Sequence, residues 1–258
     1  MNTSRNPAWN PKMVELHCQA ADKLLAIKDE AFAYLGSHPS ATEYDLQQHV
    51  INQFKAHGLV CSLLDQLIVG FDGNAAIPHY FPAKETAQVG KPGSIVLIDI
   101  WGKLPLPHAP YADITWVGTV GPSAADPEAE ATAALVFKAR DAAVSCLEEA
   151  LSARRLPTGA EVDEAAAVVL RGAGLAGRML HRTGHSIGFT SPHGIWSNVN
   201  SSNPHPLRQN LGYTIEPGAY FHERFGIRSE IDFYITDDYQ LVITTKQQQS
   251  LATISPGQ

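Results

Sequence analysis

Carboxylates inside apolar, strand-like segments constrain this chain more than any other feature of its sequence. Asp99 interrupts the run IVLIDIW, Asp113 lies in YADIT, Glu216 in YTIEPG and Glu230 in GIRSEI. Carboxylates are rarely buried unless they are paired with a cation or bound to a metal. Arg228 is the only obvious basic residue beside them in the sequence. A fold that buries these strands must therefore bring the four carboxylates toward additional positive charge.

The overall charge and the cysteine content argue against several classes of protein. The 258 residues carry 19 basic and 26 acidic side chains, and a net charge of −7 argues against a general nucleic-acid binder. An odd number of cysteines without a CxxC pair argues against a disulfide framework and favours a reducing compartment. The N-terminus has no apolar signal-peptide core, and no apolar run is long enough to span a bilayer. We therefore expect a cytoplasmic protein without membrane or nucleic-acid partners.

Hydrophobic spacing predicts two helices followed by strands, twice in succession. Asn10 before Pro11 predicts the start of the first helix, and Thr42 with Asp45 predicts the start of the second. Helices are expected over residues 11–35, 42–57, 127–153 and 160–172. Strands are expected over residues 67–71, 94–101, 111–120, 212–220, 226–236 and 239–245.

This order of elements favours an α+β fold built from two similar halves. A curved, mostly antiparallel sheet with flanking helices accounts for it. Hydrophobic residues make up 44% of the chain, which is enough for a sizeable core. No linker-like stretch divides the chain, so residues 11–248 are expected to form a single domain. Residues 1–10 and 249–258 are expected to be N-terminal and C-terminal tails.

His185 adds an imidazole to the four carboxylates and suggests a metal site. It lies in the segment GHSIG, where Gly184 and Gly188 leave the ring accessible. Four carboxylates and one imidazole form an oxygen-rich set that suits two divalent cations, with Mn²⁺ first and Co²⁺, Fe²⁺ or Zn²⁺ as alternatives. Two such ions can share one water molecule and lower its pKa.

Each of these residues also has an ordinary structural explanation. A buried aspartate in a strand is more often an ion-pair partner than a metal ligand, and a histidine in a glycine-rich loop is often merely exposed. The prediction of a metal site therefore depends on five such residues that occur in order, each within its own distinctive segment.

Six short segments resemble those of one known family. They are NAAIPHY at residues 74–80, IDI at 98–100, YADIT at 111–115, TGHSIG at 183–188, TIEPG at 214–218 and GIRSE at 226–230. Over residues 11–246 the chain resembles the pita-bread metallopeptidases, which comprise methionine aminopeptidases, aminopeptidase P and prolidases. The resemblance implies a pita-bread fold with pseudo-twofold halves and a domain that hydrolyses peptides.

The resemblance also implies how two metal ions are held. Asp99 would bind one ion, and His185 and Glu216 would bind the other. Asp113 and Glu230 would bridge both ions. Glu216 would in addition carry a proton from the attacking water to the leaving amine.

Two further histidines match positions that contact substrate in this family. His79 would contact the substrate, and His193 would donate a hydrogen bond to the scissile carbonyl oxygen. The stretch from His185 to His193 is slightly longer than is usual in the family, and His205 is an alternative to His193. His181 is expected to be structural.

Within the family, the segments NAAIPHY, EPG and GIRSE favour the proline-directed branch. The leading hypothesis is a two-metal hydrolase that removes the N-terminal residue from peptides at Xaa-Pro bonds, as an aminopeptidase P or an Xaa-Pro dipeptidase, with a water shared by the metals. Such bonds lack an amide N–H and are poor substrates for ordinary proteases. Alternatives are a methionine aminopeptidase, another amide hydrolase on this fold, and a non-enzymatic binding module.

The length of the chain leaves specificity and assembly open. Proline-specific members of the family usually carry a separate N-terminal domain, and this chain begins almost at the catalytic domain. The preferred residue before proline, the choice between dipeptides and longer peptides, and the oligomeric state therefore stay open. A homodimer is one candidate assembly.

Overall fold

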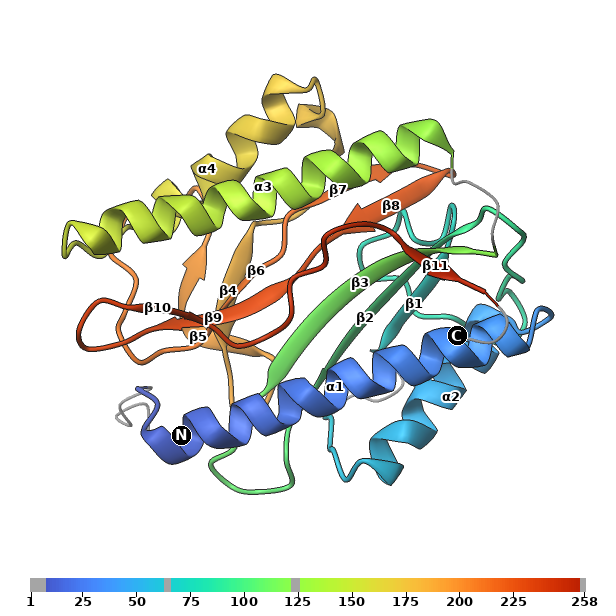
Figure 1. Ribbon diagram of the computed structural model, residues 1–258, viewed down its shortest axis with the longest axis horizontal. Coiled ribbons are helices and arrows are strands. Elements are labelled where there is room, and N and C mark those ends of the chain that lie inside the picture. The colour runs from blue at the N-terminus through green and yellow to red at the C-terminus, as the bar shows by residue number, and fades with distance from the viewer. Residues whose placement is uncertain (1–7, 63–65, 122–125, 256–258) are drawn as a thin grey trace.

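The computed structural model describes residues 8–62, 66–121 and 126–255 (Figure 1). Two pairs of helices lie on opposite sides of a group of curved strands. Within the described ranges, no helix is both long and apolar enough to cross a membrane. Because the helix pairs flank the strands, they cover them on the outside. The site described below lies among the strands.

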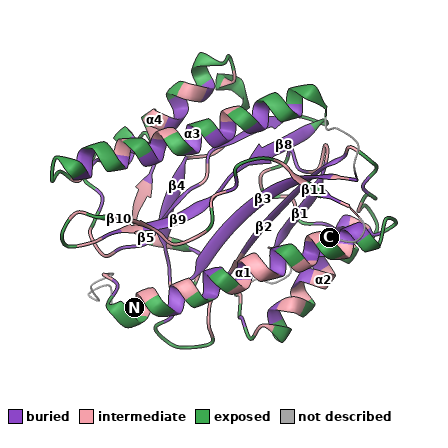
Figure 2. Ribbon diagram, viewed as in Figure 1, coloured by how far each residue is buried: buried purple, intermediate pink, exposed green. Residues whose placement is uncertain are grey.

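The first half of the chain contains two helices followed by three strands. The helices are α1 (Pro11–Ser37) and α2 (Glu43–Ala56). The strands are β1 (Ile68–Phe71), β2 (Ile95–Gly102) and β3 (Ala112–Val120). An apolar core fills the space between these helices and strands. Figure 2 shows the same division, with buried strands and exposed outer helix faces.

The second half repeats this order. Its helices are α3 (Pro127–Ser152) and α4 (Gly159–Gly172), followed by the short 3-10 helix η2 (Ala176–Arg178). Its strands are β4 (Gly184–Ile187), β5 (His193–Val199), β6 (Tyr213–Ile215), β7 (Gly218–Phe221), β8 (Phe225–Arg228), β9 (Ile231–Ile235) and β10 (Leu241–Ile243). A second apolar core joins α3 and α4 to these strands. The predicted order of elements and the two similar halves are therefore present.

The described strands form three sheets rather than the predicted one. Their orders are β1-β2-β3-β11, β10-β9-β6-β4-β5 and β7-β8. Neighbouring strands are antiparallel except for β11 (Ala252–Ile254), which runs parallel to β3. The β7-β8 sheet is separate because the strands expected over 212–220 and 226–236 are interrupted at Glu216-Pro217 and at Ser229-Glu230. Proline cannot donate to a strand ladder, so the first interruption has a local cause.

The helices begin where the sequence predicts. The Asn10 side chain accepts a hydrogen bond from the Met13 amide at 3.0 Å and caps α1. Thr42 and Asp45 cap α2 reciprocally, because each side chain accepts a hydrogen bond from the other residue's amide. Both predicted helix starts are therefore confirmed.

The prediction of a loose N-terminal tail is wrong at Trp9. Its side chain is only 5% exposed, and its ring lies 4.7 Å from the His17 ring, measured between centroids. The ring also packs directly against Gly212. An aromatic side chain buries a large apolar area, which outweighs the polar character of its sequence neighbours.

The prediction of a C-terminal tail is wrong as well. Residues 252–254 form β11, which extends the first sheet beside β3, and Ile254 is buried. The backbone of β11 pairs with an edge strand that would otherwise leave its polar groups open. Gln248 is also buried, and its side chain bonds both the amide and the carbonyl of Val117. The sequence missed these contacts because backbone pairing does not depend on apolar side chains.

Candidate functional site

A cavity of about 490 Å³ opens among the strands and receives residues from both halves of the chain. Its walls from the first half come from β1, β2, β3 and the segment after β1. Its walls from the second half come from β4, β5 and the β6–β9 region. The seven residues predicted from the sequence all line it: His79, Asp99, Asp113, His185, His193, Glu216 and Glu230.

Strand register places the first two carboxylates on the same face. β2 and β3 are antiparallel, and Asp99 lies opposite Thr115, two residues from Asp113. Side chains two residues apart point to the same side of a strand, so Asp99 and Asp113 are diagonal neighbours. Both are buried and face the cavity. Residues 103–111 connect the two strands, and the register runs unbroken from Ile95 opposite Thr119 to Gly102 opposite Ala112.

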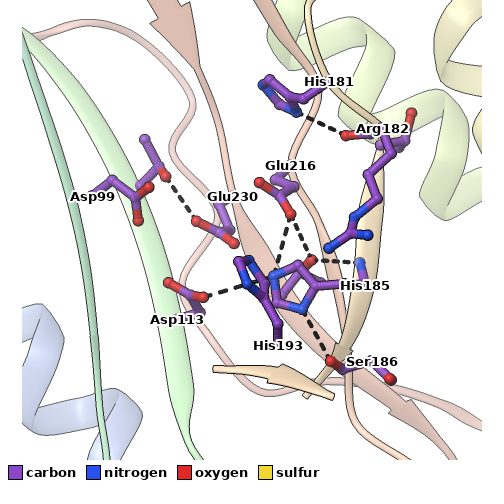
Figure 3. Close-up of polar contacts among 12 residues, drawn as sticks. Asp99, Asp113, His181, Arg182, His185, Ser186, His193, Glu216 and Glu230 are labelled. Carbon is purple, nitrogen blue, oxygen red and sulfur yellow. Dashed lines mark hydrogen bonds and ion pairs between the residues drawn. The ribbon is translucent and has the colours of Figure 1, made fainter. Parts of the chain in front are cut away.

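His185 and Glu216 come together because β4 and β6 approach closely. A Cβ atom at Gly184 would lie 2.1 Å from the Thr214 carbonyl oxygen, so only glycine permits this approach. The Glu216 amide donates to the Thr183 carbonyl at 2.6 Å. As a result, Nε2 of His185 lies 3.3 Å from Oε1 of Glu216 (Figure 3).

The hydrogen bonds of His185 leave one ring nitrogen available. Its Nδ1 lies 3.0 Å from the Ser186 carbonyl oxygen, which can only accept, so Nδ1 carries the proton. Nε2 therefore has a lone pair directed toward Glu216 and Asp113, whose Oδ2 is 3.9 Å away. A backbone acceptor at the second ring nitrogen is the usual arrangement of a metal-binding histidine.

Arg228 is the main counter-charge among these carboxylates. It is buried and forms an ion pair with Oδ2 of Asp99. Its Nε donates to the Thr115 hydroxyl at 3.1 Å, and that hydroxyl donates to Oε2 of Glu230 at 2.7 Å. Among the described cavity walls, Arg228 and Arg182 are the two arginines that face four carboxylates. The shortage of basic partners expected from the sequence is therefore present in the structure.

Burial raises the pKa of all four carboxyl groups. The pKa of Asp113 rises further because Glu230 and Asp99 lie nearby, and that of Glu230 rises further because of Glu216. Burial also raises the pKa of Asp99, although Arg228 opposes the shift. The pKa of Glu216 rises to about 7, again through burial and against the effect of Arg228. The cluster therefore favours uptake of protons or of cations.

The geometry of the cluster fits divalent metal ions. Asp113, His185 and Glu230 each offer one donor atom, and these three atoms lie within 4.8 Å of one another. Oδ1 of Asp99 and Oδ1 of Asp113 are buried and have no hydrogen-bond partner among the described residues. Buried acceptors normally have partners, so unpaired carboxylate oxygens here are explained by a cation. Four carboxylates and one neutral imidazole suit hard to intermediate divalent ions.

His193 and His79 lie at the same cavity. The His193 ring is 4.3 Å from the His185 ring between centroids and nearly perpendicular to it. Burial lowers the pKa of His193, so its ring is neutral near pH 7 and can donate one hydrogen bond. His205 is exposed and is not among the described residues that line the cavity, so it is a poor alternative to His193.

The sequence-based view of His181 as a purely structural residue is incomplete. Its Nδ1 donates to the Arg182 carbonyl at 2.8 Å, and its Nε2 accepts from the Tyr220 hydroxyl at 2.6 Å. The same ring also faces the cavity. Burial lowers the pKa of His181 to about 3, so it is neutral. His181 therefore links the cavity wall to Tyr220, which accepts a hydrogen bond from Arg228 at 3.1 Å.

Asp232 was not identified from the sequence, although it lies in an apolar strand like the predicted carboxylates. It lies in the apolar strand β9, two residues after Glu230, and is fully buried. Its Oδ2 accepts the backbone amide of Asp113 at 2.8 Å. His17 of α1 is also fully buried, with Nε2 3.7 Å from this oxygen and Nδ1 2.7 Å from the Tyr111 carbonyl. Asp232 and His17 therefore hold the backbone that carries Asp113.

Comparison with known proteins gives consistent results for family and fold. The sequence model described as metallopeptidase family M24 matches residues 15–237. A probable dipeptidase PepE from Mycobacterium tuberculosis is 30% identical over 203 residues, which cover 78% of this chain and 49% of that relative. The chain thus spans about half the length of the curated relatives it matches.

Solved structures extend the likeness to nearly the whole chain. Dipeptidase PepE from Mycobacterium ulcerans superposes with a TM-score of 0.82 at 26% identity, over 97% of this chain and 62% of that one. An X-Pro aminopeptidase from Thermotoga maritima gives a TM-score of 0.82 at 23% identity, over 96% of this chain and 64% of that one. An Xaa-Pro dipeptidase from Bacillus anthracis gives a TM-score of 0.80 at 20% identity, over 96% of this chain and 64% of that one. The α+β fold expected from the sequence is thereby confirmed.

Proposed function

We propose that this chain, which belongs to metallopeptidase family M24, removes the N-terminal residue from peptides and prefers Xaa-Pro bonds. Family membership implies a peptide substrate and divalent metal ions. The observation that carries the proposal is the cavity that brings five donor residues and two histidines together. Relatives named as dipeptidase, X-Pro aminopeptidase and Xaa-Pro dipeptidase support the choice of reaction.

The metal ligands in this proposal are Asp99, Asp113, His185, Glu216 and Glu230, and Mn²⁺ is the leading ion. Two divalent ions, when bound, supply Lewis acidity at the scissile carbonyl and lower the pKa of the attacking water. The unpaired oxygens of Asp99 and Asp113 support this assignment.

Glu216 is proposed to move the proton during hydrolysis. Its Oε1 accepts a hydrogen bond from the Thr214 hydroxyl at 3.2 Å, which holds one carboxylate oxygen in place. The carboxylate faces the cavity, where it can take a proton from the attacking water and deliver it to the leaving amine. In the metal-free protein burial raises the pKa of Glu216 to about 7, and bound divalent ions would lower it from that value.

The cavity walls also suit a proline ring. Ile68, Phe81 and Trp101 line it and provide apolar contacts. An Xaa-Pro bond has no amide N–H to satisfy, so an apolar wall beside the scissile bond carries no desolvation penalty for that group. His79 is proposed to contact the substrate from the same side as Phe81.

Hydrolysis of a small peptide panel tests the proposal. The metal-free protein is reconstituted with Mn²⁺ or Co²⁺ and given Ala-Pro, Ala-Pro-Ala and Met-Ala-Ser, each with an EDTA control. Metal-dependent cleavage of the proline peptides is expected, and their relative rates separate a dipeptidase from an aminopeptidase. Cleavage of Met-Ala-Ser alone would favour a methionine aminopeptidase. Binding of metal without cleavage of any peptide would overturn the proposed reaction.

His193→Ala is expected to lower kcat by about 10²- to 10³-fold, because it removes a hydrogen-bond donor to the developing oxyanion. Metal content, measured by atomic absorption, should stay unchanged, since His193 is not a proposed ligand. His205→Ala is the matched control, because this histidine is exposed and outside the described cavity walls. Equal kcat values for the two variants would remove His193 from the mechanism.

Asp232→Asn is expected to weaken Mn²⁺ binding by about 10- to 100-fold, because Asp113 loses the charged acceptor of its amide. Calorimetric titration of the metal-free protein measures the affinity directly. Asp238→Asn, at an exposed position beyond the same strand, is the control. Unchanged affinity in Asp232→Asn would show that the hydrogen bond does not orient the ligand.

A further inference from the structure

Glu43 is a fully buried carboxylate that is not one of the proposed metal ligands. It is the first residue of α2 and is 0% exposed. It is not among the described residues that line the cavity. Both of its oxygens accept hydrogen bonds from a single later stretch of chain: the Phe71 amide at 2.6 Å, the Asn74 side-chain amide at 2.9 and 3.1 Å, the Tyr80 hydroxyl at 2.8 Å and the Gln88 amide at 3.0 Å.

The stretch that Glu43 binds carries two cavity residues. His79 and Phe81 flank Tyr80 in the sequence, and both line the cavity while Tyr80 points to Glu43. Asn74 Nδ2 also donates to the Tyr80 hydroxyl at 3.0 Å, so the donors bond one another as well as Glu43. The carboxylate therefore holds the outer side of the segment whose inner side faces the substrate.

The inner side of the same segment is held by other contacts. Nη1 of Arg228 donates to the Pro78 carbonyl at 3.3 Å, and Arg228 is paired with Asp99. A Cβ atom at Gly226 would lie 1.9 Å from the Ala75 carbonyl oxygen, so the segment packs directly on the backbone of β8. Glu43 is thus a polar anchor of this segment that is separate from the Arg228 contact, and it is not a proposed metal ligand.

We infer that Glu43 is a positioning residue for substrate recognition. It holds residues 72–81 in place, and this keeps His79 and Phe81 against the substrate. This inference rests on the proposed function. A carboxylate only accepts hydrogen bonds, and its two oxygens match the donors that surround it. Glutamine has the same size but replaces one acceptor oxygen with an NH2 group that faces those donors. Glu43→Gln therefore weakens the anchor on one side without leaving a cavity.

A matched pair of variants tests the inference. Asp45 lies in the same helical turn, is exposed, and bonds only with Thr42 in the structure described. Both Glu43→Gln and Asp45→Asn are expected to lower the Tm. Only Glu43→Gln should lower kcat/KM for Ala-Pro, by about 10- to 100-fold. The loss should appear mainly in KM, because His79 and Phe81 contact the bound substrate rather than the reacting atoms.

Two measurements separate this effect from general damage. Mn²⁺ affinity, measured by calorimetry, should be the same in Glu43→Gln and in the unmodified protein. Deuterium exchange of the amides in residues 72–81, measured in the metal-free protein, should accelerate in Glu43→Gln and not in Asp45→Asn. If Glu43→Gln fails to fold, Tyr80→Phe removes one donor and should raise both KM and exchange to a smaller extent.

The outcomes distinguish this inference from the proposed function. If no peptide is cleaved by the unmodified protein, the proposed function fails, while faster exchange in Glu43→Gln still establishes the anchor. If Xaa-Pro peptides are cleaved and Glu43→Gln leaves KM unchanged, the inference is wrong although the function stands. Equal exchange and equal KM in Glu43→Gln and Asp45→Asn would also overturn it.

Discussion

Replacing Glu216 with Gln is expected to lower kcat on Ala-Pro by about 10²- to 10⁴-fold while the fold stays intact. Glutamine has the same shape and can still accept the hydrogen bond from Thr214 that Oε1 of Glu216 accepts at 3.2 Å. It cannot take up a proton from the attacking water. It also removes a negative charge that lies 3.3 Å from Nε2 of His185. One substitution therefore removes both the proposed proton carrier and a charged metal ligand.

The measurement is steady-state hydrolysis after reconstitution with Mn²⁺, with the metal content of each sample determined separately. Glu164→Gln is the matched control, because this glutamate is on α4 and its side chain is 59% exposed. Full metal content with lost turnover would point to the proton transfer, and loss of metal would point to ligation. If Glu216→Gln kept more than a tenth of the activity, neither role would stand.

Local signals in the sequence predicted the helices and most strands well, because they act within a turn or along one strand. Asn10, Thr42 and Asp45 cap their helices by contacts no more than three residues away. The resemblance to the pita-bread metallopeptidases is confirmed by the match to family M24, and so is the fold. The strands over 212–220 and 226–236 were predicted as continuous because only their apolar content was weighed, and not the proline after Glu216.

Contacts between distant segments could not be predicted in the same way. Asp232 and His17 meet across 215 residues, and nothing near either residue in the sequence indicates the partner. The same applies to β11, whose order comes from backbone pairing with β3. A search for carboxylates inside apolar strands would have found Asp232, because Asp232 also interrupts an apolar strand. Its contact with the Asp113 amide needed the three-dimensional approach of β3 to β9.

The carboxylates Asp99 and Asp113 show both what local sequence predicts and what it leaves out. Their positions in apolar segments predicted that they would share a site. Only the register of β2 against β3 places them on one face, and a shift of that register by one residue would point them to opposite faces. The structure brings all seven predicted site residues to one cavity.

Adding Mn²⁺ to the metal-free protein is expected to raise the free energy of unfolding by about 4 kcal/mol when the free ion is a thousandfold above its Kd. The increase should be large at pH 8 and should shrink as the pH falls below about 7, where Glu216 takes up a proton. Protons and cations compete for the same oxygens, because burial and neighbouring charges raise the pKa of Asp113 and Glu230 as well.

In the metal-free protein, the direction of each pKa shift decides whether that group stabilises the fold at low or at high pH. Glu216 has a folded pKa of about 7 against an ordinary value of 4.5, so its contribution to stability is present below 4.5 and is lost as the pH rises through 7. Burial lowers the pKa of His17 to about 4 and that of His181 to about 3, so their contributions are present above the ordinary value of 6.5 and are lost at lower pH. The contributions of His17 and His181 are common to the metal-bound and metal-free proteins, so they largely cancel when the two are compared at one pH. The contribution of Glu216 does not cancel, because a bound metal ion excludes its proton.

Urea unfolding at pH 5.5 and at pH 8, each with EDTA or with excess Mn²⁺, gives four free energies of unfolding. Their differences measure the effect of Mn²⁺ at each pH. Asp113→Asn is the decisive variant, because it removes a proposed ligand and also one of several buried like charges. It should abolish the metal-dependent increase and should make the metal-free protein more stable at pH 8 than the unmodified chain. An Mn²⁺-dependent increase of equal size at both pH values, or one that persists in Asp113→Asn, would show that the ion binds elsewhere. The buried carboxylates would then need another source of compensating charge.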